Sequence, residues 1–98
     1  MYLKAQDLIN LINEKTLYSL WDADEVIDKK AKKVASHLEL DKHRWYSTAV
    51  NVYECDDGFV GIFGVYQSFS ESQMLDDINV VCEASRYKEV KTVTYIPE

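Results

Sequence analysis

The sequence has only two cysteines, no internal repeat and no low-complexity segment. It also lacks an apolar run approaching the ~20 residues of a membrane span, so we expect no membrane insertion. Its 98 residues are too few for a second core, which predicts a single domain over residues 1–98. Two cysteines without a secretory leader indicate free thiols in a reducing compartment, and hence a cytoplasmic protein. A Cys55–Cys82 disulfide is the alternative, if the strands place the two residues together.

Basic residues are also few. The chain has 11 Lys and Arg against 17 Asp and Glu, which gives a net charge of -6. Nucleic acids and anionic membranes are bound through clustered Lys and Arg that neutralise phosphates. The charge balance therefore disfavours direct nucleic-acid binding, whereas an apolar content of 47% is ordinary for a folded globular protein.

Catalytic and metal-binding motifs are missing from the chain. His37 and His43 are the only histidines, and neither lies in the HExxH or CxxC spacing of a metal site. Cys55 lies between Glu54 and Asp56, and nearby carboxylates raise the pKa of a thiol and suppress the thiolate that a nucleophile needs. The sequence therefore predicts a protein that is not an enzyme and has no metal or cofactor.

Apolar spacing predicts two N-terminal helices. The first covers residues 4–14, where small and aliphatic side chains recur at helical intervals. The second is expected from Asp22 to about Leu38, with Asp22 and Glu25 as an acidic capping box at its start. Lysines occupy the remaining faces of this second helix, where we expect them to be solvated. The apolar stripe on which it rests is Ile27, Ala31, Val34, Ala35 and Leu38.

The most informative stretch is RWYSTAVNVYECDDGFVGIFGVYQSF, residues 44–69, which predicts a β-hairpin. Asp57–Gly58 suits a two-residue type I′ turn, in which both central residues need positive φ. Alternation then divides the apolar side chains between two faces. The face expected to lie beneath the helices carries Val50, Val52, Phe63 and Val65. The face expected to be half-exposed, because Asn51 and Gly64 dilute it, carries Tyr53, Val60, Ile62 and Tyr66.

Two glycines lie inside the second strand of this hairpin. Glycine normally weakens a strand interior, so Gly61 and Gly64 indicate either a bulge or a close approach by another group. A bulge at Gly61 would exchange the two faces beyond it.

The C-terminal third is predicted to contain one short helix and two strands. Ser70 and Gln73 match a capping box, which indicates a helix over 71–77. Residues 79–87 fit a strand or a helix, and the β-branched residues at 80 and 81 favour the strand. Residues 89–96 alternate in the manner of a strand that ends at Pro97.

Together these patterns predict an α+β fold with two N-terminal helices packed on an antiparallel sheet of three to four strands, with the hairpin 44–69 at its centre. Tyrosine is enriched in protein contact patches because it joins a large apolar area to a polar group. We therefore predict a non-enzymatic interaction or regulatory module that binds a protein partner, or a second copy as a homodimer. The predicted contact residues are Tyr53, Val60, Ile62 and Tyr66.

Two alternative functions stay open at this point. One is a small-ligand-binding domain, with a pocket between helices and sheet near Trp45, Tyr46 and Phe63. The other is an acidic inhibitor of a nucleic-acid enzyme, encoded by a mobile genetic element.

Overall fold

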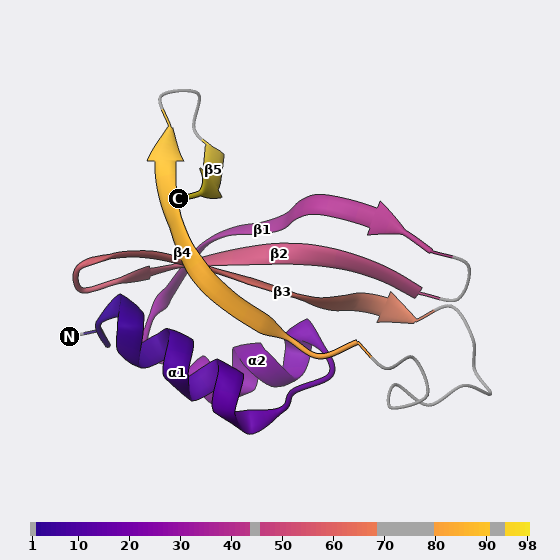
Figure 1. The fold of residues 1–98 in the computed structure, drawn as a ribbon, viewed down its shortest axis with the longest axis horizontal. Helices are drawn as coiled ribbons and strands as arrows, with labels where there is room; N and C mark the ends of the chain where they lie inside the picture. Colours follow the sequence, from indigo (N-terminus) through magenta and orange to yellow (C-terminus); the bar gives the residue numbers. More distant parts are fainter. Residues whose placement is uncertain (1, 44–45, 69–79, 91–93) are drawn as a thin grey trace.

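The structure is a computed structural model that describes residues 2–43, 46–68, 80–90 and 94–98. This part of the chain contains two helices and five strands, and the strands form one antiparallel sheet in chain order. Both helices lie on the same side of the sheet, and the fourth strand runs steeply across the second and third (Figure 1). The α+β class is thus confirmed, with five strands instead of three to four. The elements are α1 (Ala5–Lys15), α2 (Leu20–Ile27), β1 (Lys32–Lys42), β2 (Tyr46–Cys55), β3 (Gly58–Ser68), β4 (Glu83–Val90) and β5 (Thr94–Pro97).

Helix α1 confirms the helix predicted over residues 4–14. It buries Leu8 and Ile12, which are one turn apart, against the sheet. Its first turn is capped from a distant part of the chain, because the Ala5 backbone N–H donates to Asp57 Oδ1 at 2.7 Å. A carboxylate at this position also complements the positive end of the helix dipole. The helix ends at Lys15, and the C-cap residue Thr16 adopts a left-handed φ of 51°.

The second predicted helix is wrong over more than half of its length. Helix α2 ends at Ile27, and Lys32–Lys42 form the edge strand β1 instead of continuing the helix to Leu38. The predicted N-cap is also wrong, because Ser19 Oγ accepts the hydrogen bond from the Asp22 backbone N–H at 3.2 Å. Asp22 is therefore a first-turn residue of α2 and not its cap.

Strand β1 resembled a helix in the sequence because it is bulged. Ala35 pairs with Val52 and Leu38 pairs with Val50, so three residues of β1 span two residues of β2. Three such register shifts interrupt the strand, and His37 and Glu39 adopt positive φ. The bulges place apolar residues on one face at a spacing of three, which imitates a helical repeat. Bulges and lysines also protect an edge strand from pairing with another chain.

The hairpin is present, but its turn lies one residue earlier than predicted. Cys55 pairs with Gly58, so Asp56 and Asp57 form the turn and Gly58 begins β3 with a φ of 155°. Tyr53 consequently pairs with Val60 instead of Ile62. A register change of two residues leaves each side chain on its face, so the composition of the two faces follows the prediction.

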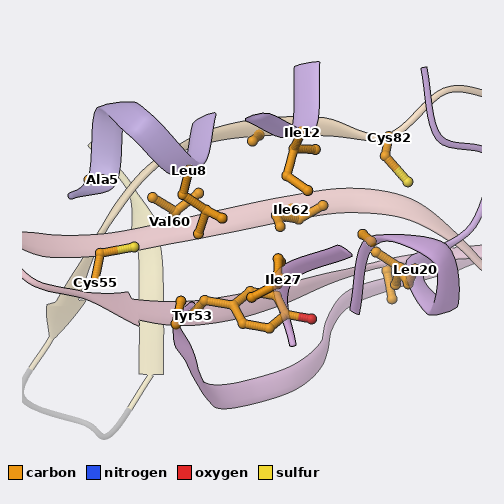
Figure 2. Packing of buried hydrophobic residues seen from close by; sticks show 14 residues of the cluster. Ala5, Leu8, Ile12, Leu20, Ile27, Tyr53, Cys55, Val60, Ile62 and Cys82 are labelled. Atoms are coloured by element: carbon orange, nitrogen blue, oxygen red, sulfur yellow. The ribbon is translucent and has the colours of Figure 1, made fainter. Parts of the chain in front are cut away.

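The helices cover the face that was predicted to be half-exposed, so the predicted assignment of the two faces is wrong. Tyr53, Val60 and Ile62 are at most 1% exposed and pack with side chains from both helices, as Figure 2 shows. The side chains of Leu8 and Ile12 point from α1 toward β3 in this view. Val50, Val52 and Phe63 lie on the side of the sheet that faces away from the helices.

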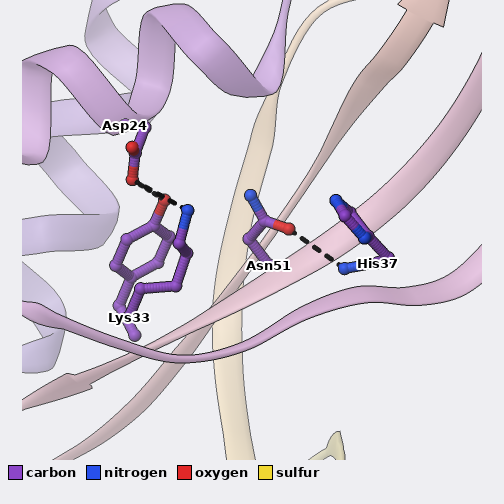
Figure 3. Close-up of polar contacts among 5 residues, drawn as sticks. Asp24, Lys33, His37 and Asn51 are labelled. Carbon is purple, nitrogen blue, oxygen red and sulfur yellow. Dashed lines mark hydrogen bonds and ion pairs between the residues drawn. The ribbon is translucent and has the colours of Figure 1, made fainter.

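Small residues explain why the helices pack on this face. A Cβ added to Gly64 would lie 2.6 Å from Cys82 Sγ and 3.2 Å from the side chain of Leu20, the first residue of α2. The glycine therefore allows α2 to approach the sheet closely. Asn51 is accommodated in the same layer because its Oδ1 accepts the His37 backbone N–H at 3.2 Å (Figure 3). The two residues that diluted the apolar pattern are thus compatible with burial.

The C-terminal strands form a hairpin. Strand β4 covers Glu83–Val90. The strand predicted over 79–87 is therefore confirmed over residues 83–87. Strand β5 pairs antiparallel with β4, so the single strand predicted over 89–96 is wrong. The helix predicted over 71–77 lies outside the described residues. Asn13 of α1 holds the free edge of β4, because its side chain accepts from the Ala84 N–H at 2.9 Å and donates to the Ala84 carbonyl at 3.4 Å.

Candidate interaction surface

The side of the sheet away from the helices, called the open face below, contains three cross-strand rows that run through all of β1 to β4, and a shorter row of Asp41, Thr48 and Val65 beside the first of them. Side chains directly opposite each other in antiparallel strands share a face, so each row follows from the pairing of β1 through β4. The first row is Leu38, Val50, Phe63 and Glu83. The second row is Ala35, Val52, Gly61 and Ser85. The third row is Lys32, Glu54, Phe59 and Tyr87.

The middle of the open face is covered by Tyr87. A Cβ added to Gly61 would lie 2.3 Å from Tyr87 Cε1, so the ring lies directly on the glycine. The Tyr87 hydroxyl then donates to Glu39 Oε2 of β1 at 2.9 Å. Burial and this carboxylate raise the pKa of Tyr87 to about 12. Val50 and Val52 beneath the ring are at most 2% exposed. The pairing of β2 with β3 is unbroken at Gly61, so this glycine marks a close approach by a side chain and not a bulge.

The contact between Tyr87 and Glu39 shows how strongly the sheet is curled. Strands β1 and β4 are separated by β2 and β3, which in a flat sheet would place them about 14 Å apart. A hydrogen bond between their side chains requires the twist to bring the two strands nearer to each other over the open face. The open face is therefore partly shielded by the protein's own strands.

One end of the open face remains accessible to solvent. Phe63 is 38% exposed, although its partner Val50 is 2% exposed and the next residue in the row, Leu38, is half-buried. Phe63 thus extends a buried apolar row into solvent. Ile96 has a similar exposed fraction, 41%, but it alternates with Tyr95 and points to the other side of the sheet.

The opposite end of the open face is aromatic and acidic. The rings of Phe59 and Tyr95 pack at a centroid distance of 5.1 Å with an interplanar angle of 54°. Partial desolvation and the Glu89 carboxylate, followed by that of Glu54, raise the pKa of Tyr95. Carboxylates therefore lie close to both aromatic residues at this end.

The predicted contact residues lie on the covered face. Val60 and Ile62 are fully buried, and Tyr66 is half-buried with its ring centroid 4.2 Å from that of His37. The expectation that this set forms an open surface is therefore wrong, because the helices occupy it.

Tyr53, the fourth predicted residue, has a structural partner of its own. Its hydroxyl donates to Asp24 Oδ1 at 2.8 Å, and Lys33 Nζ lies 3.6 Å from the same carboxylate (Figure 3). Burial and the Asp24 carboxylate raise the pKa of Tyr53. This contact joins α2 to β1 and β2.

The other groups considered from the sequence are separated in the structure. Cys55 and Cys82 are both free, and burial raises the pKa of each thiol to about 11. His43 Nε2 lies 3.4 Å from Thr48 Oγ1 and 3.7 Å from Asp41. Within the described ranges, no group of three or more His, Cys, Asp or Glu side chains could hold a metal ion.

The predicted ligand pocket is not formed as expected. Phe63 belongs to the open face and does not lie between the helices and the sheet. Tyr46 is half-buried and stacks on His43 at a centroid distance of 4.6 Å, and Trp45 lies outside the described residues.

The chain matches no protein-family model, and comparisons with curated proteins and with solved structures find no match either. Among the residues whose positions are described, neither helix has the length and apolar character to cross a membrane.

Proposed function

We propose that the protein is a non-enzymatic interaction module that binds a protein partner on the open face, with Phe63 at the centre of the contact. The observation that carries this proposal is the row from Leu38 through Val50 to Phe63, which is buried in its middle and exposed at Phe63. Aromatic side chains are enriched at the centres of protein interfaces, where covering them contributes most of the binding energy.

The second supporting feature is a side-chain link between two strands across the open face. The Tyr87 ring lies against Gly61, and its hydroxyl bonds to Glu39, so β4 and β1 are linked across the open face. A surface held in one conformation loses less entropy when a partner binds. The proposal therefore requires no rearrangement of the sheet.

Site-specific crosslinking can identify the partner. Benzoylphenylalanine replaces Phe63 in one variant and Ile96 in a matched variant, because both positions are apolar and about 40% exposed but lie on opposite sides of the sheet. We expect one protein to be crosslinked from position 63 in the native host and not from position 96.

Titration with the purified partner then tests the surface directly. We expect Phe63→Ser to weaken binding by about 2 kcal/mol, or roughly 30-fold in Kd, as for an interface hot spot. Ile96→Ser should bind like the unmodified protein. Equal affinities for the two variants, with both folded by circular dichroism, would contradict the proposal.

A further inference from the structure

Charge is distributed unevenly between the two sides of the sheet. Among the described residues, the open face carries five carboxylates, of which Asp41 pairs with Thr48 and the other four lie near aromatic side chains. Glu83 pairs with Phe63, Glu54 pairs with Phe59, Glu89 lies 3.5 Å from the Tyr95 hydroxyl, and Glu39 accepts the hydrogen bond from Tyr87. In the described part of the chain, the rows of this face contain Lys32, which pairs with Glu54, and His43 lies 3.7 Å from Asp41.

Basic side chains of the neighbouring strands are directed to the helix-covered side. Lys33 lies 3.6 Å from Asp24 of α2, and Arg86 lies 3.9 Å from Asp57 in the β2–β3 turn. Lys88 alternates with Tyr87 and Glu89 along β4 and therefore points away from the open face. Among the described residues, the carboxylates near the aromatic side chains of the open face thus outnumber the basic groups on the same side.

We infer that the occupant of the open face is a cationic protein segment, in which an apolar side chain covers Phe63 and flanking Lys or Arg side chains face the carboxylates. This inference rests on the proposed function and specifies the chemistry of the partner. A second copy docked through the same face would bring two surfaces of the same negative charge together, because a two-fold interface uses the same patch on both copies. Nucleic-acid phosphates would meet the same repulsion.

Synthetic peptides with one apolar centre, Leu-Phe-Leu, test this chemistry. Three series carry lysine, serine or glutamate on both sides of that centre, and their binding to the full chain is measured by fluorescence anisotropy at low and high salt. We expect the lysine series to bind about tenfold more tightly than the serine series, and this preference to decrease as salt screens the carboxylates. The glutamate series should bind most weakly.

Matched charge reversals locate the effect on the surface. Glu83→Lys should remove the preference for lysine over serine, because Glu83 lies directly beside Phe63. Glu25→Lys makes the same change in net charge at an exposed position of α2, and this variant should keep the preference for lysine over serine. Phe63→Ser should weaken the lysine and serine series alike.

The possible outcomes separate this inference from the proposed function. If the lysine and serine series bind equally and both lose binding in Phe63→Ser, the docking surface stands but the inference of a cationic partner is overturned. Binding that is insensitive to Phe63→Ser, or absent from every series, would overturn both. A dimer in sedimentation that becomes monomeric in Phe63→Ser would show that the occupant is a second copy, and would also overturn the cationic partner.

Discussion

Substitution of Gly61 by alanine tests the arrangement on which the open face depends. The added methyl would lie 2.3 Å from Tyr87 Cε1 and 2.4 Å from Cδ1, distances that real contacts do not reach. The ring must therefore move away from the sheet. Its displacement would uncover Val50 and Val52 and would break the hydrogen bond to Glu39.

The size and the sign of the effect follow from this contact. Overpacking of a buried site costs about 1–3 kcal/mol, and loss of the hydrogen bond adds about 1 kcal/mol. We therefore expect Gly61→Ala to lower the free energy of unfolding by about 3 kcal/mol. In a Tyr87→Val background the ring is absent, and alanine should instead stabilise the strand by roughly 0.5–1 kcal/mol relative to glycine.

Urea unfolding of the four proteins in this double-mutant cycle measures the coupling. The expected coupling energy is about 3.5–4 kcal/mol, slightly above the usual limit of about 3 kcal/mol for residues in direct contact. Gly64→Ala serves as the control, because its methyl would meet Cys82 and Leu20, so Tyr87→Val should not rescue it. An equal cost of Gly61→Ala in both backgrounds would refute the placement of the ring over Gly61.

Two further predictions concern the helix cap and the buried thiols. Ser19→Ala should lower the free energy of unfolding by about 1 kcal/mol, because it removes the N-cap of α2. Asp22→Ala should lower the free energy of unfolding by less in the same urea titration. A larger loss for Asp22→Ala than for Ser19→Ala would show that Asp22 is the cap. Burial raises the pKa of Cys82 from 9.0 to about 11, so the folded state keeps this thiol neutral at a pH where the unfolded chain ionises it. Its contribution to stability is therefore complete below pH 9 and lost as the pH rises to about 11. Cys82→Ala should show a shallower loss of stability over this range, and an identical slope in the variant would argue against the burial of the thiol.

Local patterns were sufficient to predict α1 and the central hairpin. Helix α1 has an apolar repeat without glycine or proline, and the strands of the hairpin flank a short polar turn. Alternation also predicted which side chains share a face, and the two-residue error in register did not change that result. Interactions between neighbouring residues determine these features, so one sequence contains enough information for them.

Small and polar residues within a strand usually indicate an exposed face, which is why the contact residues were predicted on the face that the helices cover. Gly64 instead allows α2 to approach the sheet closely, and Asn51 accepts the hydrogen bond from the His37 backbone N–H. Gly61 did signal a close contact, but its partner Tyr87 is 26 positions away in the sequence. Periodicity within a strand carries no information about such a partner.

The sequence by itself determined the α+β class, the first helix, the hairpin and the side chains that each face of the hairpin carries. The tertiary structure decided that Lys32–Lys42 pair with β2 as a bulged strand and that the helices cover Tyr53, Val60 and Ile62. It also placed Tyr87 over Gly61, and it left Phe63 as the exposed apolar side chain of its row. The sequence could not decide these features because a segment with helix-like apolar spacing, or a strand with alternating side chains, can pack against more than one partner. The choice between those partners depends on steric fit and hydrogen bonds between residues that are distant in the chain.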